Sequence, residues 1–203
     1  MTPPKAVIFD IGNVLIRWQP EAYYDRRFGV ARRKALFGAV DLHAMNEDID
    51  AGAPFLATVQ AWAARHPDWA AEIMLWHDDW AGLAAPLIEG SWDILHRLRA
   101  AGVPVFALSN IGDDTTTLAE SGPYPQLAAF DRRYISGRMG VTKPDPRIYE
   151  MVQADCGLAG PDLYFIDDRA ENIATAAALG WRTHLFTAPD RLAADLRVQG
   201  LPL

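Results

Sequence analysis

The sequence predicts an α/β protein, a Rossmann-like doubly wound parallel sheet with a helical cap inserted after its first strand. Three observations predict this class. Five short apolar runs lack polar alternation, as do strands that are buried on both faces. Helical patterns separate the later runs, as in repeated strand–helix units, and one long helical stretch interrupts the order near the start.

The five apolar runs are the candidate strands of the sheet. Each is short, rich in aliphatic and aromatic residues, and bounded by glycine, proline or polar residues. They lie at residues 6–9, 103–108, 134–135, 163–166 and 184–186.

Three segments between the later runs carry the apolar spacing of amphipathic helices. Segment 91–100 repeats apolar residues at every third position and is followed by Gly102. Segments 146–156 and 171–179 also end just before a glycine, a common helix stop. Strand and helix therefore alternate over the second half of the chain.

Residues 18–86 break this alternation. They contain no convincing strand, only helical stretches rich in alanine, tryptophan and leucine, such as 55–65 and 69–83. We therefore expect a core formed by residues 1–17 and 87–203, with residues 18–86 as a helical insertion.

The composition of the 203 residues argues against nucleic-acid binding. Hydrophobic residues make up 50% of the chain, enough for a sizeable core, and the formal net charge is −7. A nucleic-acid surface needs clustered basic residues, and the one basic run, residues 32–34, is typical of a solvated helix face.

Further absences indicate the compartment. The single cysteine, Cys156, leaves no internal disulfide and favours a reducing environment. The first residues carry no apolar signal segment, and no run approaches the length of a membrane span. We expect a cytoplasmic protein with no membrane partner, either a monomer or a weak homodimer.

Polar residues stand at or after the ends of four predicted strands. They are Asp10, Ser109 and Asn110, Lys143, and Asp167 and Asp168. Taken singly, each fits an ordinary role in a turn, a loop or a helix cap. Parallel strands, however, bring their carboxyl ends to one edge, where ligands bind. Three carboxylates and a lysine together at one edge indicate a cation, and Mg²⁺ suits such oxygen ligands.

Four motifs in this order carry a resemblance to a known family. FDIGNVL, LSN, KPDPRIY and FIDDRAEN together resemble the haloacid dehalogenase-like hydrolase superfamily. The match covers the predicted sheet core, and the insertion lies where the family places a helical cap. The first motif most resembles the bacterial α-glucose-1-phosphatase-like branch. The resemblance implies a Mg²⁺-dependent phosphatase that acts on a small phosphorylated metabolite such as a sugar phosphate.

The resemblance also implies roles for the residues of the reaction. Asp10 would be the nucleophile that forms an aspartyl-phosphate, later hydrolysed by water. Ser109 and the backbone of Asn110 would hold the phosphoryl oxygens. Lys143 would offset charge on the nucleophile and on the transferring group.

The implied metal site uses the remaining polar residues. Asp10, the backbone carbonyl of Gly12 and Asp167 would bind Mg²⁺ directly. Asp168 would bind it through water or orient the lysine. Asn172 would support the metal ligands, although a surface or capping role explains it equally well.

Gly12 departs from the pattern of the family's phosphatases, which usually carry a second aspartate two residues after the nucleophile. That aspartate protonates the leaving oxygen, and general acid–base catalysis of this kind typically increases the reaction rate by about 10²–10⁴-fold. Asn13 does not titrate and cannot replace it. Three interpretations stay open. The first is a phosphatase whose acid–base role falls to water or a cap residue and which favours a leaving group that departs easily. The others are a dehalogenase that needs neither Mg²⁺ nor an acid, and a silent module that binds a phosphate ligand or a partner protein.

The insertion is the expected source of specificity. It is rich in aromatic residues, of which Trp76 and Trp80 lie four apart and are expected to share one packed face. Rings of this kind can stack on a sugar, but at helical spacing they more often form core. His77 has a suitable side chain for proton transfer, yet nothing places it near Asp10, and we do not expect it to act there.

Overall fold

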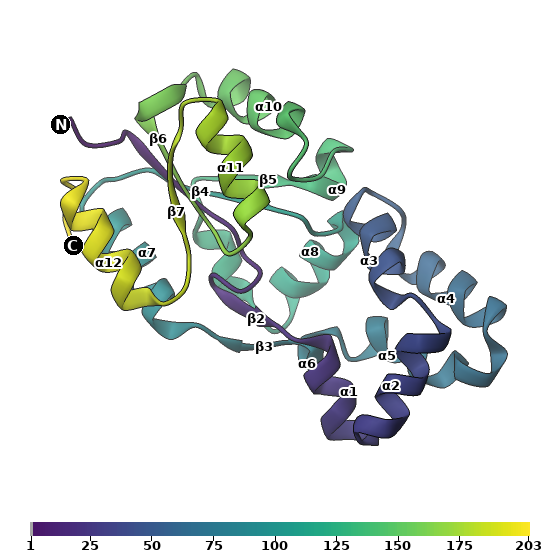
Figure 1. Cartoon of the computed structure of the whole chain (residues 1–203). Helices are drawn as coiled ribbons and strands as arrows, with labels where there is room; N and C mark the ends of the chain where they lie inside the picture. Colours follow the sequence, from purple (N-terminus) through teal and green to yellow (C-terminus); the bar gives the residue numbers. More distant parts are fainter. Residues whose placement is uncertain (1) are drawn as a thin grey trace.

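The core of the molecule is a parallel sheet with helices on both faces (Figure 1). The computed structural model describes residues 2–203. Five strands pair in the order β5–β4–β1–β6–β7. Their bounds are β1 Ala6–Phe9, β4 Val105–Ser109, β5 Arg132–Ile135, β6 Leu163–Asp167 and β7 Arg182–Leu185. Each predicted strand is present within two residues of its expected bounds, and the predicted α/β class is confirmed.

The strands are apolar throughout because helices bury both faces of the sheet. In β1, Ala6 and Ile8 belong to one buried cluster, together with residues of α10 and α11. Val7 and Phe9 point the other way and belong to a second cluster, with residues of α7 and α12. The core helices are α7 Glu89–Ala100, α8 Asp113–Ser121, α9 Ser136–Met139, α10 Pro146–Cys156, α11 Ala170–Ala178 and α12 Pro189–Val198, with short 3₁₀ turns η2 Pro125–Ala129 and η3 Gly160–Asp162.

The order of the strands places a crevice beside β1. From β1 the chain builds outward through β4 and β5 on one side, then returns to add β6 and β7 on the other. At such a reversal, the connections after neighbouring strands separate toward opposite faces of the sheet. The carboxyl ends of β4, β1 and β6 therefore surround one open space.

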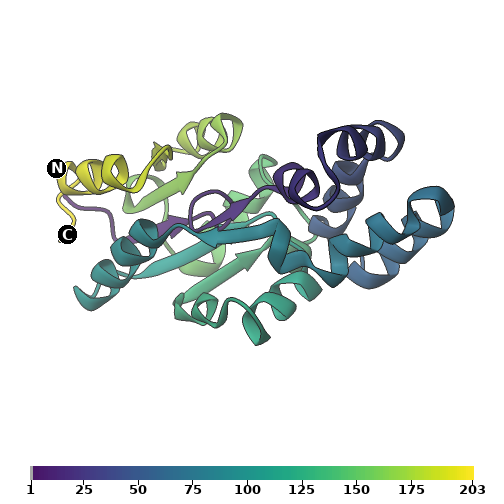
Figure 2. The ribbon, with the colours of Figure 1, turned by 90° about the horizontal axis from the view of Figure 1, so that it is seen from below.

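A group of helices, here called the cap, lies beside this edge of the sheet. Its elements are α1 Pro20–Phe28, α2 Val30–Ala39, α3 Leu42–Asp50, α4 Phe55–Arg65, η1 Pro67–Trp69, α5 Ala70–Asp78 and α6 Trp80–Leu83. Both chain termini lie at the opposite end of the core (Figures 1 and 2). The expected helix at 55–65 is present, whereas the expected stretch at 69–83 is divided at Asp79.

The expectation that residues 18–86 contain no strand is wrong. Strand β3, Ala84–Leu87, pairs antiparallel with β2, Ile16–Trp18, in a two-stranded ribbon where the chain enters and leaves the cap. The sequence Ala-Ala-Pro-Leu has little intrinsic strand preference, so pairing with a distant partner makes the strand. The ribbon ties both connections of the cap to each other.

Trp76 is at the centre of an aromatic cluster within the cap. Its side chain is fully buried, and its ring lies 5.6 Å from that of Trp18 and 6.3 Å from that of Tyr24, between ring centroids. Trp80 is also buried and packs against Trp18, with a centroid separation of 6.4 Å. Trp76 and Trp80, expected to share one packed face, both pack against Trp18, but they belong to the separate helices α5 and α6 and do not form one helix face.

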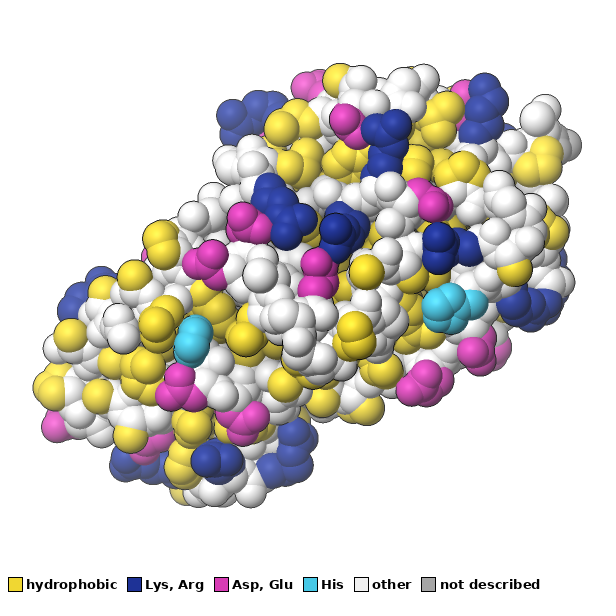
Figure 3. Space-filling model, turned by 180° about the vertical axis from the view of Figure 1, so that it is seen from behind, with side chains coloured by type: hydrophobic (Ala, Val, Ile, Leu, Met, Phe, Trp, Pro, Cys, Tyr) yellow, Lys and Arg dark blue, Asp and Glu magenta, His cyan; other side chains and the backbone are white. Residues whose placement is uncertain are grey.

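The basic run of the cap is paired with carboxylates. Arg32 Nε donates to Glu72 Oε1 at 2.9 Å, and Arg33 Nε donates to Asp25 Oδ1 at 2.9 Å. On the face drawn in Figure 3, basic side chains lie scattered among acidic ones instead of forming one patch. Among residues 2–203, no helix combines the length and the apolar character that crossing a bilayer requires.

The aromatic cluster predicts where the cap is most sensitive to mutation. Trp76→Ala removes a fully buried ring and should lower the free energy of unfolding by about 3–5 kcal/mol in urea denaturation. Trp62→Ala is the matched control, because this ring is only partly buried and lies against Arg65. Equal losses in the two variants would contradict the assignment of Trp76 to the cap core.

Candidate active site

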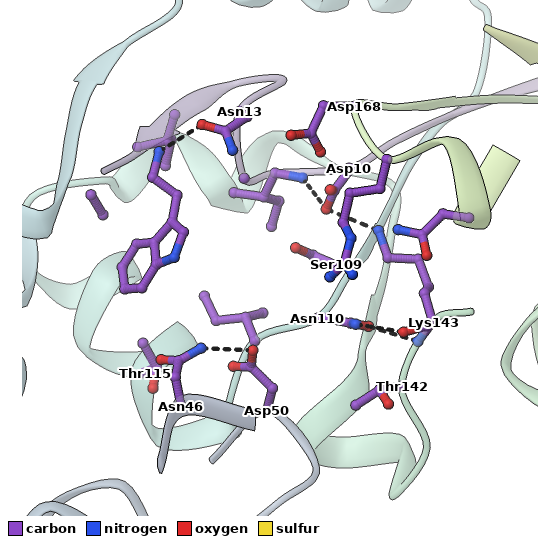
Figure 4. A pocket seen from close by; sticks show the side chains of 18 of the residues that line it. Asp10, Asn13, Asn46, Asp50, Ser109, Asn110, Thr115, Thr142, Lys143 and Asp168 are labelled. Atoms are coloured by element: carbon purple, nitrogen blue, oxygen red, sulfur yellow. Dashed lines mark hydrogen bonds and ion pairs between the residues drawn. The ribbon is translucent and has the colours of Figure 1, made fainter. Parts of the chain in front are cut away.

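A cavity of about 460 Å³ opens at the carboxyl edge of the sheet. Its wall includes nearly all the site residues predicted from the sequence. They are Asp10, Gly12, Ser109, Asn110, Lys143, Asp168 and Asn172. The remaining one, Asp167, is fully buried directly behind Lys143. Four separate motifs therefore meet around one space, as Figure 4 shows for the labelled residues.

Lys143 is the hub of this arrangement. Its Nζ donates to Asp167 Oδ2 at 2.6 Å and to the backbone carbonyl of Leu108 at 2.9 Å, and lies 3.1 Å from Asp10 Oδ1. The side chain is almost completely inaccessible to solvent. Burial alone lowers the pKa of Lys143, but the adjacent Asp10 and Asp167 carboxylates outweigh this and raise it. Lys143 is therefore a fixed positive charge.

Asp10 occupies a less favourable environment for a charged group. Burial raises the pKa of its carboxyl group, Lys143 lowers it, and Asp167 raises it again, with a net result of about 7. The backbone N–H of Ile11 donates to Asp10 Oδ1 at 2.7 Å and holds the carboxylate in place. One lysine thus does not fully compensate the negative charge gathered here.

The same excess of charge fits a divalent cation. Carboxylate oxygens of Asp10, Asp167 and Asp168 lie within 4.8 Å of one another. Burial and then the charge of Asp167 raise the pKa of Asp168 as well. One lysine among three carboxylates leaves two negative charges uncompensated. The oxygen atoms of these carboxylates are hard ligands of the kind that Mg²⁺ prefers.

Asn172 is part of this site and not a surface residue. Its Nδ2 donates to both carboxylate oxygens of Asp167 at 3.0 Å, and its side chain is buried. The backbone N–H of Arg169 also donates to Asp167 Oδ1, at 2.8 Å. Within residues 2–203, Asn172 Oδ1 is buried without a hydrogen-bond partner, which leaves a polar oxygen available beside the acidic cluster.

Asn110 connects the second motif to the third. Its Nδ2 donates to the backbone carbonyl of Lys143 at 2.8 Å, and its Oδ1 accepts from the backbone N–H of Lys143 at 2.8 Å. This pair of bonds uses the amide side chain to hold the lysine loop, which leaves the backbone of Asn110 for a ligand. Ser109 ends β4 beside Asp10, and its hydroxyl lowers the pKa of that carboxyl group.

Gly12 is not required by crowding or by backbone strain. An added Cβ at this position meets no atom within 4 Å. The left-handed residue of the turn is Asn13, with a φ of 54°, whose Oδ1 accepts from the backbone N–H of Trp18 at 3.1 Å. The turn geometry therefore leaves room for a side chain where the family's phosphatases carry their second aspartate.

Several residues of the cavity wall were not identified as candidates from the sequence. They are Arg17, His43, Asn46, Glu47 and Asp50 from the ribbon and the cap, and Thr115, Thr142 and Arg169 from the core. The spacing of Asn46 and Asp50, four apart on α3, is a sequence signal that could have identified a polar helix face. His77 lies elsewhere, bonded to Asp78 and packed on Phe55.

One side of the cavity is apolar. Trp80 lines it from the cap, and Ile16, Trp18 and Ala84 line it from the ribbon. Leu127 of η2 adds a further apolar side chain from the core. The cavity is therefore amphipathic, with the charged groups gathered at the sheet edge.

Comparison with known proteins gives a family and distant relatives. A family model described as haloacid dehalogenase-like hydrolase matches residues 4–180. A drimenol cyclase from Aspergillus calidoustus is 25% identical over 199 residues, which cover 95% of this chain and 36% of that protein. A sesquiterpene phosphatase from Aspergillus oryzae is 32% identical over 88 residues, covering 43% of this chain and 44% of that protein. The chain thus spans less than half the length of either curated relative.

Among solved structures, a HAD family enzyme from Bacteroides thetaiotaomicron, determined as a magnesium complex, has the same fold. The TM-score is 0.68 at 23% identity, and the match covers 92% of this chain and 95% of that one. At this level of identity, the likeness concerns the fold alone.

The raised pKa of Asp10 predicts a pH-dependent effect on stability. The pKa of this carboxyl group rises from 3.8 to about 7 on folding, so its ionisation lowers the free energy of unfolding of the protein. This loss of stability accumulates as the pH rises between those two values. Asp10→Asn removes the charge. With a metal chelator present, the substitution should therefore raise the free energy of unfolding more at pH 8 than at pH 5. The difference between the two gains should be on the order of 2 kcal/mol.

Urea unfolding at both pH values measures this difference. Asp48→Asn, an exposed position on α3, serves as the control and should behave alike at the two pH values. A benefit of Asp10→Asn that is larger at pH 5 would show that Asp10 gains, and does not lose, from its surroundings.

Proposed function

This chain belongs to the haloacid dehalogenase-like hydrolase family, and we propose that it is a Mg²⁺-dependent phosphomonoester hydrolase that works through an aspartyl-phosphate on Asp10. One observation carries the proposal. A buried carboxylate, Asp10, faces a cavity between a fixed positive charge, Lys143, and the acidic pair Asp167–Asp168. This arrangement suits transfer of a phosphoryl group to a carboxylate.

In this reaction Asp10 attacks phosphorus, and the phosphoryl group is held at the sheet edge. The Ser109 hydroxyl and the Asn110 backbone would donate to the phosphoryl oxygens. Lys143 offsets the negative charge that Asp10 and the phosphoryl group bring together, and its bond to Asp167 holds it in position. Water then hydrolyses the aspartyl-phosphate and restores Asp10.

The residues suited to Mg²⁺ are Asp10, Asp167 and the Gly12 carbonyl, with Asp168 acting directly or through water. Asn172 positions Asp167 through its two amide bonds. A bound Mg²⁺ supplies electrostatic stabilisation of the phosphoryl oxygens and favours the ionised nucleophile. The acidic cluster supports this cofactor through its uncompensated charge.

The substrate we propose is a small phosphorylated metabolite. A cavity of about 460 Å³ limits its size, and the Trp18 and Trp80 side of the wall suits either the apolar face of a sugar or a hydrocarbon group. The sesquiterpene phosphatase among the relatives supports including the second class. The test panel therefore contains α-glucose 1-phosphate, other sugar phosphates and an isoprenoid monophosphate.

Phosphate release from this panel, with Mg²⁺ and with a chelator, tests the proposed activity. We expect release that requires Mg²⁺ and is abolished in Asp10→Asn, because the amide cannot act as the nucleophile. Retained release in Asp10→Asn would refute the nucleophile assignment. Halide release from 2-haloacids without Mg²⁺, together with no phosphate release, would identify a dehalogenase instead.

The open space at Gly12 predicts that an aspartate there alters the leaving-group preference. Gly12→Asp adds a titratable group without a clash at Cβ, and it should raise turnover of alkyl phosphates relative to aryl phosphates, by at most about 10²-fold, because only the poorer leaving group needs a proton. Gly12→Asn is the matched control, since it has the same shape and no proton to give. Equal turnover in the two variants would show that position 12 does not limit the reaction.

A further inference from the structure

We propose that Asp50, at the end of cap helix α3, is the acid–base group of this enzyme and takes over the task that an aspartate at position 12 performs in related phosphatases. This inference rests on the proposed function and adds a catalytic residue to it. Asp50 lines the same cavity as Asp10, from the opposite side. In Figure 4, the Asp10 and Asp50 carboxylates lie on opposite sides of Ser109 and Asn110, where the phosphoryl group would sit.

This placement has the geometry that the leaving oxygen needs. In an in-line displacement at phosphorus, the leaving oxygen departs on the side away from the nucleophile. Asp10 attacks from the sheet edge, so the leaving oxygen points toward the cap. Asp50 stands on this cap side and is therefore placed to protonate the leaving oxygen.

Asp50 is anchored to the core although it belongs to the cap. Its backbone carbonyl accepts from Ser136 Oγ of α9 at 2.6 Å. The same hydroxyl oxygen accepts from the backbone N–H of Ile111, the second residue after β4, at 2.9 Å. A single serine thus ties the end of α3 to the loop that carries Asn110.

The orientation of the Asp50 side chain follows from a buried tryptophan. Trp76 Nε1 can only donate, and it donates to Asn46 Oδ1 at 3.0 Å. The Asn46 amide nitrogen must then face the other way, and it donates to Asp50 Oδ2 at 2.8 Å. Asn46 is therefore a positioning residue that fixes the orientation of the Asp50 carboxyl group.

The surroundings of Asp50 favour its protonated form. Burial raises the pKa of this carboxyl group, the charges of Asp10 and Glu47 raise it further, and a hydrogen bond from the Gly112 backbone and the charge of Lys143 lower it by less. The charged and titratable side chains that line the cavity with it are Asp10, Arg17, His43, Glu47, Lys143, Asp168 and Arg169. Asp10 lies beside the positive charge of Lys143, whereas Asp50 lies beside the neutral amide of Asn46. Asp10 is therefore suited to act as an ionised nucleophile and Asp50 as a proton donor.

The proposed steps balance in atoms and protons. Asp10 attacks phosphorus, the bond from phosphorus to the leaving oxygen breaks, and that oxygen takes the proton of Asp50 and departs as an alcohol. Water then enters the vacated place and attacks phosphorus. The ionised Asp50 accepts a proton from that water while the bond between Asp10 and phosphorus breaks. Inorganic phosphate leaves, and both aspartates return to their starting states.

Leaving-group dependence in the full-length protein with Mg²⁺ tests this role. An alkyl phosphate such as glycerol phosphate needs a proton on its leaving oxygen, whereas p-nitrophenol departs as a stable anion. Asp50→Asn keeps the shape of the side chain. It should lower kcat/KM for the alkyl phosphate about 10²-fold or more, but change kcat/KM for p-nitrophenyl phosphate only a few-fold. This ratio reports the step in which the leaving group departs and not the later hydrolysis of the aspartyl-phosphate, which both substrates share. Asp48→Asn, on the same helix and exposed, is the control.

Two further readouts distinguish proton transfer from a structural role. Wild-type kcat/KM for the alkyl phosphate should fall as the pH rises through the pKa of Asp50, and this alkaline limb should be absent in Asp50→Asn. Gly12→Asp in the Asp50→Asn background should restore part of the lost alkyl phosphate turnover, because it returns an acid to the site. Gly12→Asn in the same background should not.

Several results would overturn the inference. Equal losses of kcat/KM for both leaving groups, no loss at all, or no recovery with Gly12→Asp would remove Asp50 from protonation of the leaving oxygen. An infrared difference spectrum of the Mg²⁺-loaded protein at pH 7 gives a readout without turnover: a protonated-carboxyl band that Asp50→Asn lacks is expected, and its absence refutes the inference. If the wild-type protein releases no phosphate, the proposed function fails first. Release that needs Asp10 but not Asp50 defeats the inference alone.

Discussion

The buried lysine Lys143 is the constraint on which the rest of the structure depends. A lysine in a protein interior is tolerated only when its charge and its donors are matched. Here the partners come from three neighbouring strands: Asp10 follows β1, Leu108 lies in β4, and Asp167 ends β6. The strand order β4–β1–β6 therefore brings together the three groups that allow the charge of Lys143 to be buried. The Asn110 side chain completes the arrangement by holding the lysine backbone.

The same network leaves a surplus of negative charge, and two features of the site follow from it. The cluster of Asp10, Asp167 and Asp168 favours a divalent cation, because one lysine cannot neutralise three carboxylates. The surplus also acts on Asp50 across the cavity and, together with burial, favours its protonated form. In this proposal, Lys143 and a bound Mg²⁺ favour the ionised nucleophile on the sheet side, and the negative charge on that side favours a protonated carboxyl group on the cap side.

Much of the core was predictable because its pattern is local. Buried parallel strands are apolar at every position, so each was found within two residues of its observed bounds. The ribbon was not predictable in this way, since β3 depends on pairing of Trp18 with Ala84 across the entire cap. The role of Asn172 was equally undecided in the sequence, where an asparagine one turn into a helix has several uses. Its contact with Asp167 exists only once α11 packs beside β6.

The sequence by itself determined the fold class and the meeting of four motifs at one edge, because parallel strands joined by crossovers place their carboxyl ends together. Only the tertiary structure decided which cap residues face that edge. The position of Asp50 depends on a hydrogen bond to Ser136, 86 residues away, and on the Asn46 amide that Trp76 orients from 30 residues away. Such contacts leave no periodic trace in the chain, since they arise from how helices pack and not from the preference of any one segment.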